Sequence, residues 1–277
     1  MKRSFISLWL MLLFFASDAH PAFELSGAGS RIRAMGFAYA GLANTPDAVY
    51  LNSSGLAAIA VPVFSASYFS PFGIKELTHV SLAAVFPVAI GNLGVSISRF
   101  GNDLYSEQTA LLSYSRKLSE NFYFGTNIHY HKLQIKGYGS DFCVGIDAGI
   151  LYKFSATVNW GFFTTNINRP KFGSADDYLP QFFISGVHLK PTENININID
   201  LFKEIAFPVE LRAGIEYILA RKIAFRCGFA TEPAQFCAGL GFIFQHVNCD
   251  YAMSTHLDLG LTHQFSISFR LTKNSTH

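Results

Sequence analysis

Two histidines could in principle hold a metal ion. His129 and His131 are two residues apart, so in an extended strand both imidazoles lie on one face. A zinc site needs at least three protein ligands, and the sequence places no third ligand beside the pair. We therefore interpret them as two polar side chains on an interior face, and we predict no metal and no cofactor.

The sequence contains 4 cysteines, which would suggest disulfides if the protein is exported. Cys227 and Cys237 lie in two consecutive segments that read as a hairpin. Matching the hydrophobic faces of these segments pairs Phe229 with Phe236, and that register puts the two sulfurs on opposite faces of the sheet. We predict free cysteines that pack as small hydrophobic side chains.

A third group of candidate residues is charged, and its members occupy the even positions of two consecutive segments. They are Glu210, Arg212, Glu216, Lys222 and Arg226. Opposite charges on neighbouring strands can satisfy one another in a narrow interior, which is the structural interpretation. The functional interpretation is a polar gate, or a dock for another segment. Neither is catalytic, and no nucleophile elbow, phosphate loop or metalloprotease motif is present, so we predict that the protein is not an enzyme.

These charges sit in segments whose side chains alternate between apolar and polar. In the run from Asn194 to Asp200, every odd position is Ile and every even position is polar. Successive side chains of a strand point to opposite faces, so this pattern predicts a strand with one apolar and one polar side. The segments 209–217 and 261–271 repeat it.

Counting such segments predicts fourteen strands with no helix between them, which excludes a parallel layout with crossover helices. They lie near residues 62–70, 77–88, 91–100, 107–118, 121–134, 141–153, 156–167, 179–189, 192–203, 208–218, 221–231, 234–244, 246–255 and 261–271. Most have the length that a tilted strand needs to cross a membrane. Longer and shorter connections also alternate along most of the chain, as in outer-membrane barrels.

Composition decides between a membrane barrel and a secreted sandwich. Half of the residues are hydrophobic, only 14% are charged and the net charge is +2, so disorder and a nucleic-acid partner are both excluded. Fourteen strands with aromatic side chains on their apolar face carry more apolar surface than one shared core can bury. We predict an all-β, 14-stranded antiparallel transmembrane barrel whose apolar face contacts the lipid bilayer.

The first residues have the pattern of a secretory signal peptide. Lys2 and Arg3 precede an apolar run from Phe5 to Ala16, and small residues follow it. We predict cleavage after Ala19 and export to a Gram-negative outer membrane. We thus predict that residues 1–19 are the signal peptide, residues 20–60 an N-terminal plug segment, residues 61–271 the barrel and residues 272–277 a tail.

The N-terminal segment lacks the alternation of the strands. From Phe23 to Ile59 it is rich in glycine, alanine and turn residues, and it is long enough to fold into a barrel interior. The alternative is a flexible arm on the surface.

Part of this segment resembles the N-terminal signature of the FadL-type outer-membrane transport superfamily and of its shorter PorV/PorQ-like relatives. The resemblance covers residues 27–57 and rests on Arg33, Ala34, Met35, Gly36, Gly41, Asp47, Asn52, Gly55 and Leu56. It implies a fourteen-stranded barrel whose N-terminal segment plugs the pore. This chain has Ser53 and Ser54 where the family commonly has Pro-Ala.

The resemblance implies two functions that stay open here. The first is the passage of small hydrophobic compounds across the outer membrane. The second is a PorV/PorQ-like accessory role in protein secretion or surface attachment, with secretion-system proteins as partners. The mature chain, of about 258 residues, leaves little room for the large extracellular loops of fatty-acid transporters, which weakens the case for specific uptake of long-chain fatty acids.

Overall fold

The computed structural model describes residue 23, residues 27–173 and residues 178–271. The predicted signal peptide (1–19) and tail (272–277) lie outside these ranges. Among the described residues, no helix is long and apolar enough to cross a bilayer.

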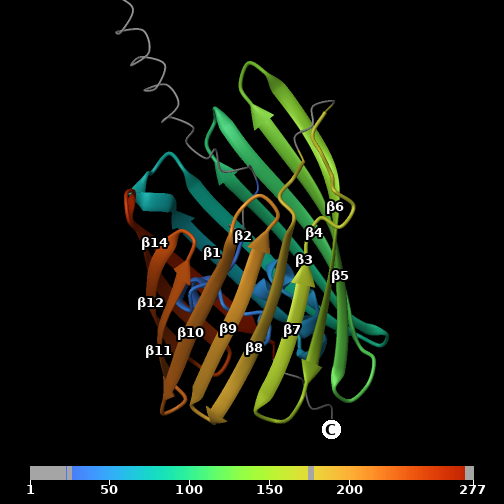
Figure 1. Ribbon diagram of the computed structural model, residues 1–277, viewed down its shortest axis with the longest axis vertical. Coiled ribbons are helices and arrows are strands. Elements are labelled where there is room, and N and C mark those ends of the chain that lie inside the picture. The colour runs from blue at the N-terminus through green and yellow to red at the C-terminus, as the bar shows by residue number, and fades with distance from the viewer. Residues whose placement is uncertain (1–22, 24–26, 174–177, 272–277) are drawn as a thin grey trace, which may run out of the picture.

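The described chain forms a closed antiparallel barrel of fourteen strands, which confirms the predicted fold class (Figure 1). The strands are β1 (Val63–Ser70), β2 (Thr78–Val88), β3 (Gly91–Gly101), β4 (Tyr105–Lys117), β5 (Phe122–Ile135), β6 (Gly139–Lys153), β7 (Val158–Thr164), β8 (Phe182–Thr192), β9 (Ile195–Glu204), β10 (Val209–Leu219), β11 (Ile223–Thr231), β12 (Ala234–Ile243), β13 (Val247–His256) and β14 (Gly260–Arg270). Each strand pairs with its neighbours in sequence, and β1 pairs with β14 to close the wall. Closure leaves no strand at the edge of the sheet, as hydrocarbon requires.

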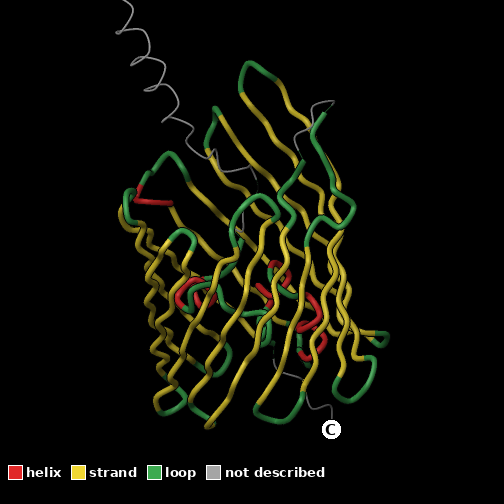
Figure 2. Tube along the Cα trace, viewed as in Figure 1, coloured by secondary structure: helices red, strands yellow, loops and turns green. Residues whose placement is uncertain are grey.

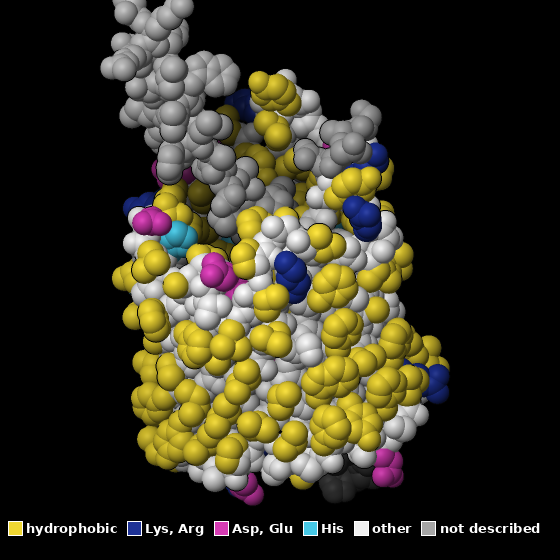
Figure 3. All heavy atoms as spheres, in the orientation of Figure 1, with side chains coloured by type: hydrophobic (Ala, Val, Ile, Leu, Met, Phe, Trp, Pro, Cys, Tyr) yellow, Lys and Arg dark blue, Asp and Glu magenta, His cyan; other side chains and the backbone are white. Residues whose placement is uncertain are grey.

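The alternating pattern orients the side chains as predicted. In β9, Asn196, Asn198 and Asp200 are buried inside the barrel, whereas Ile199 and Leu201 are about half exposed on its outer face. Hydrophobic side chains gather over the barrel body in Figure 3, and charged side chains lie towards its two ends. Such an outer surface is stable against lipid and costly against water.

The register of β11 and β12 is the one predicted from the matching of hydrophobic faces. Phe229 pairs with Phe236 and Cys227 pairs with Ala238, so Cys227 and Cys237 point to opposite faces. All four cysteines are free, which confirms that prediction.

The two ends of the barrel differ. At one end the strands are joined by tight turns, such as Ala220–Lys222. At the other end most connections are equally short, but two are longer: residues 71–77 join β1 to β2, and residues 165–181 join β7 to β8. The predicted alternation of longer and shorter connections is therefore limited to these two, because the strands extend further into the other connections than predicted. β7 ends at Thr164, three residues before its predicted end. The residues of β6 before Ala148 therefore have no strand next to them on this side, and the 165–181 connection lies beside them instead. The hairpin of β5 and β6 projects furthest at this end (Figure 1).

The N-terminal segment lies inside the barrel and not on its surface. It contains a short α-helix, α2 (Ser30–Ala34), and two 3₁₀ helices, η1 (Pro46–Tyr50) and η2 (Ser53–Ala58). Figure 2 shows these helices enclosed by the strands. A third 3₁₀ helix, η3 (Pro71–Gly73), lies in the connection from β1 to β2.

The hydrophobic core of the described chain is therefore inside the barrel, between this segment and the wall. Ile32, Tyr39 and Leu56 of the segment are fully buried, and they belong to one cluster with wall residues such as Phe163 and Ile184. Burial of each large side chain stabilises the folded chain by roughly 1.5–3 kcal/mol.

Candidate functional site: the barrel interior

The signature residues of the N-terminal segment all lie in the interior. Arg33, Ala34, Met35, Gly36, Gly41, Asn52, Gly55 and Leu56 are buried, and Asp47 is partly buried. We call residues 27–60 the lumenal segment. α2 contacts β11 to β14, η1 contacts β1 to β3, and η2 contacts β3 to β6.

The lumenal segment meets the rest of the wall through its backbone. A Cβ atom added to Gly161 of β7 would lie 2.0 Å from the carbonyl oxygen of Ala40, and one added to Gly214 of β10 would lie 2.3 Å from that of Met35. Only glycine permits so close an approach of two backbones. With the helices above, the segment therefore contacts the wall around its whole circumference.

Two polar side chains fix the centre of this segment. Asp200 of β9 accepts hydrogen bonds from the backbone N–H groups of Tyr39 (2.7 Å) and Ala40 (2.9 Å) through one carboxylate oxygen. Asn52 donates to the carbonyl oxygens of Ala40 (2.9 Å) and of Ile150 in β6 (3.0 Å). Its side-chain oxygen also accepts from the backbone N–H and the hydroxyl of Ser54, which caps η2.

The predicted charges of β10 and β11 form part of a buried network. Arg31 of α2 donates to both carboxylate oxygens of Glu216, at 2.7 and 2.8 Å. Arg226 donates to Glu216 (2.6 Å) and to Asp250 of β13 (2.6 Å). Two arginines thus bind two carboxylates. One of these, Asp250, was not among the charges noted in the sequence. Sequence analysis also did not assign a role to Arg31.

Glu210 and Arg212 form a separate pair inside the barrel. The guanidinium donates to both carboxylate oxygens at 2.8 Å, and it also stacks over the ring of Phe202 at 3.7 Å.

The prediction is wrong for Lys222. Lys222 is an even-numbered residue, like those of β11 that face inward, but it is exposed in the turn before β11. Ala220 and Arg221 have positive φ values of 49° and 59°, and Lys222 N–H donates to the carbonyl oxygen of Leu219. The tight hairpin therefore ends the strand before Lys222 and places it at the rim.

Arg33 is buried without a carboxylate partner among the described residues. Its guanidinium donates to Gln264 and to the hydroxyl of Ser254 (3.3 Å), and it stacks against the rings of Phe37 and Phe69. Burial lowers the pKa of Arg33 to about 10, so the side chain stays charged at neutral pH. Aromatic faces and neutral acceptors replace a counter-ion here.

Asp47 lies near the wall in η1. Burial raises the pKa of Asp47 to about 6, although the hydroxyl of Ser65 in β1 donates a hydrogen bond of 3.0 Å that opposes this rise.

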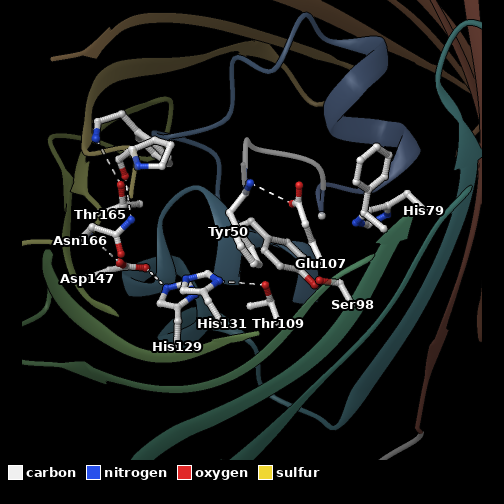
Figure 4. A pocket seen from close by; sticks show the side chains of 15 residues that line it. Tyr50, His79, Ser98, Glu107, Thr109, His129, His131, Asp147, Thr165 and Asn166 are labelled. Atoms are coloured by element: carbon white, nitrogen blue, oxygen red, sulfur yellow. Dashed lines mark hydrogen bonds and ion pairs between the residues drawn. The ribbon is translucent and has the colours of Figure 1, made fainter. Parts of the chain in front are cut away.

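Beyond the lumenal segment, towards the longer connections, the interior holds a cavity of about 80 Å³. The residues that line it are Phe23, Gly27, Tyr50, His79, Ser98, Phe100, Glu107, Thr109, His129, His131, Asp147, Thr165, Asn166, Pro180 and Phe182. Figure 4 shows its polar side chains converging from β2 to β6 and from the 165–181 connection.

The two histidines noted in the sequence lie side by side in this cavity. Their rings are stacked with centroids 5.1 Å apart. His129 Nε2 contacts the carboxylate of Asp147, and His131 Nδ1 contacts the hydroxyl of Thr109 at 3.0 Å (Figure 4). Asp147 was not a candidate from the sequence, but the alternation along β6 would have placed it on the inward face beside His129. The described residues include no group of three or more His, Cys, Asp or Glu side chains arranged to hold a metal ion.

Phe23 lines the same cavity beside the histidines. Its ring packs on its edge against His131, with the centroids 4.8 Å apart, and is stacked with Phe172 at 5.5 Å. Its backbone N–H donates to Glu107 at 2.9 Å, and Glu107 also accepts from the hydroxyl of Tyr105 at 2.6 Å.

Comparison with known proteins gives structural neighbours only. No protein-family model matches the sequence, and no curated protein matches it significantly. The toluene transporter TbuX of Ralstonia pickettii superimposes with a TM-score of 0.68 at 14% identity, over 91% of this chain and 100% of that one. The toluene transporter TodX of Pseudomonas putida gives 0.65 at 11% identity, over 91% and 99%. A FadL homologue of Pseudomonas aeruginosa gives 0.63 at 12% identity, over 87% and 97%. At these identities the likeness shows a shared barrel fold.

Proposed function

We propose that this chain is a FadL-like outer-membrane protein that passes small hydrophobic compounds across the outer membrane. The observation that carries the proposal is the aromatic-lined cavity inside a closed barrel, on the long-connection side of the lumenal segment. The aromatic lining of this cavity comes from Phe23, Phe100 and Phe182, and from Tyr50 of the lumenal segment.

Three further features support the proposal. The outer wall is apolar, so the barrel fits a bilayer. Barrels of this fold with named cargo include two toluene transporters. The signature residues Arg33 to Gly36 resemble the same superfamily and are buried in the interior. We propose that the lumenal segment closes the barrel to ions and water while the cavity holds a hydrophobic compound.

The alternative role as an accessory of protein secretion is not carried forward. None of the three neighbours named above is described as a secretion component. No feature of the described residues specifically favours such a partner.

Uptake into liposomes tests the proposed passage. Purified full-length protein is reconstituted into liposomes, and the entry of radiolabelled toluene and of a sugar of similar size is followed. We expect the protein to accelerate hydrocarbon entry over protein-free liposomes and to leave sugar entry unchanged. Equal acceleration of both solutes would indicate a general porin, and acceleration of neither would contradict the proposal.

A second arm assigns the passage to the cavity. Phe23→Ala enlarges the cavity where Phe23 contacts His131, and Phe154→Ala removes an exposed aromatic ring outside it. We expect the first variant to change the rate of toluene entry and the second to leave it unchanged.

A further inference from the structure

The charged side chains of the barrel wall are sorted by sign. In the described strands, every aspartate and glutamate occupies a position of the inward-facing series. The outward-facing positions of the same strands hold four charged residues, and all four are basic: Arg99, Arg116, Lys132 and Lys203. A cation on a lipid-facing wall is costly near the midplane of a bilayer and much less costly near its surface. The height of each residue on the wall therefore decides what it can bind.

Arg99 and Lys132 both lie near the boundary of the apolar band on the long-connection side. Arg99 is eight residues beyond Gly91, the first residue of β3, and Lys132 is ten residues beyond Phe122, the first residue of β5. At about 3.3 Å per residue and a strand tilt of about 40°, they stand roughly 20 Å and 25 Å above the short turns. The apolar band of such barrels is about 25 Å tall, so both side chains are at the level of the lipid headgroups.

Gln108 of β4 stands between these two cations on the outer face. Arg99 pairs with Gln108 across one strand boundary, and Gln108 pairs with Lys132 across the next. Neighbouring strands are about 4.8 Å apart, so the Cα atoms of Arg99 and Lys132 are separated by roughly 10 Å. Their long side chains can therefore converge on one group in front of Gln108, whose amide adds a further donor. We call these three residues the polar row.

Apolar side chains lie directly beneath the polar row on the same face of the wall. Two and four residues further down the same three strands, the register forms two more rows across β3, β4 and β5. Their members, all exposed, are Ile97, Ala110 and Tyr130 in the first row and Val95, Leu112 and Ile128 in the second. Donors at headgroup level above an apolar surface are complementary to a lipid with an anionic headgroup and acyl chains.

The two cations of the polar row keep most of their charge available. Arg99 has one ion pair among the described residues, with Asp103 at 4.0 Å, and the two side chains are 56% and 100% exposed. Ion pairs that are so exposed are weak. Lys132 has no ion-pair partner among the described residues. An anion from outside the chain can therefore bind both.

We propose that Arg99, Gln108 and Lys132 bind the headgroup phosphate of an anionic lipid in the leaflet on the long-connection side, with its acyl chains along the apolar rows. Arginine binds a phosphate through paired hydrogen bonds, and lysine binds it as a point charge. The occupant is a lipid and not a soluble protein, because the polar row faces the bilayer. This inference rests on the proposed location in a membrane, but it does not require the passage of hydrophobic compounds.

The test titrates the purified full-length protein in detergent with phosphatidylglycerol, which is anionic, or with phosphatidylcholine, which carries no net charge. Native mass spectrometry gives the dissociation constant of the first lipid that binds. We expect phosphatidylglycerol to bind at least about fivefold more tightly, since one basic residue beside an anionic headgroup contributes about that factor. Inorganic phosphate at the same concentration should not displace it, because phosphate alone makes no contact with the apolar rows.

Single substitutions assign this preference to the polar row. Arg99→Gln and Lys132→Gln should each lower it about fivefold, whereas Lys132→Arg, which keeps the charge, should retain it. Arg116→Gln is the matched control, because Arg116 also faces outward but lies at the opposite end of β4, beside Phe124. This control should leave the preference unchanged. If a variant does not fold, the two lipids on the unmodified protein still decide the question.

Three results would overturn the inference. They are equal binding of the two lipids, an equal loss of preference in Arg116→Gln, and displacement of the bound lipid by inorganic phosphate. None of them bears on the passage of hydrophobic compounds, which liposome uptake tests separately. Conversely, a failure of toluene uptake would leave the lipid site standing.

Discussion

Arg31 of α2 and Glu216 of β10 are joined by two hydrogen bonds of 2.7 and 2.8 Å, between residues 185 positions apart in the chain. The pair ties the lumenal segment to the barrel wall. Glu216 also accepts from Arg226, so a single carboxylate satisfies one buried and one partly buried guanidinium group. Glu216 of β10 thus pairs with Arg226 of β11 and also holds Arg31 of the N-terminal segment. Pairing between strands and docking of another segment, the two interpretations drawn from the sequence, occur in one network.

Neutralising Glu216 tests this tie. In Glu216→Gln the two guanidinium groups lose their shared counter-charge in a buried place, and we expect the free energy of unfolding to fall by about 3 kcal/mol. Urea unfolding in detergent, followed by tryptophan fluorescence, measures the change. We also expect ion-conducting openings in planar bilayers that the unmodified protein does not show.

The control for this variant is Glu193→Gln. Glu193 forms an ion pair with Arg221 at 3.1 Å, but both side chains are more than four-fifths exposed. Exposed pairs contribute at most about 1 kcal/mol, so this variant should unfold almost as the unmodified protein does. An equal loss in both variants would show that the buried pair has no special role.

The outer face of the barrel can be tested with a charge. Leu201 of β9 is 54% exposed on the apolar outer surface. If that surface faces hydrocarbon, Leu201→Lys should destabilise the barrel by roughly 2–4 kcal/mol when the residue lies near the midplane of the bilayer. Folding into liposomes at graded urea concentrations measures this value.

Ile205 provides the matched position. It is 58% exposed but lies just beyond the end of β9, at the rim. Ile205→Lys should therefore cost less than about 1 kcal/mol. Comparable costs at both positions would argue against a membrane around the barrel body.

Asp47 predicts how the contact between η1 and the wall depends on pH. Its pKa is raised to about 6, above the value of an unfolded chain, so the folded state binds the proton more tightly. The contact is then most stable below about pH 4 and loses stability as the pH rises towards 6. The loss continues through pH 6 and is complete by about pH 7.

Hydrogen exchange of the backbone amides of residues 47–50, measured from pH 4 to pH 7 and corrected for intrinsic exchange, detects this change. Ser65, Arg31 and Asp250 are the groups around Asp47 that influence its pKa, besides its own backbone. Asp47→Asn should remove most of the pH dependence, whereas Asp258→Asn, in the exposed connection of β13 and β14, should leave it unchanged. Persistence of the full dependence in Asp47→Asn would assign it to another group.

Much of the barrel could be predicted from the sequence because it depends on local patterns. The Ile and Asn alternation of residues 195–199 fixes which side chains face inward, and a single matched pair, Phe229 and Phe236, fixes the register of β11 and β12. The alternation rule failed at Lys222, because it says which face a strand residue points to but not where a turn ends the strand.

The interior was harder to predict, since its contacts join residues that are distant in the chain. His129 meets Asp147 across a hairpin, and Arg31 meets Glu216 across most of the chain. The alternation along each strand shows that wall residues such as Asp147 and Glu216 point inward. It does not show which residue of the N-terminal segment each of them contacts. Asp200 is an example: its role as the acceptor for the amides of Tyr39 and Ala40 has no signal in the sequence.

The most direct test of the account is the ion conductance of single barrels in planar bilayers, with and without the N-terminal segment. The unmodified protein should be closed to ions, and a variant that lacks residues 23–57, folded as judged by its heat-dependent mobility in gels, should show stable open steps. A folded variant without conductance would contradict the claim that this segment closes the pore.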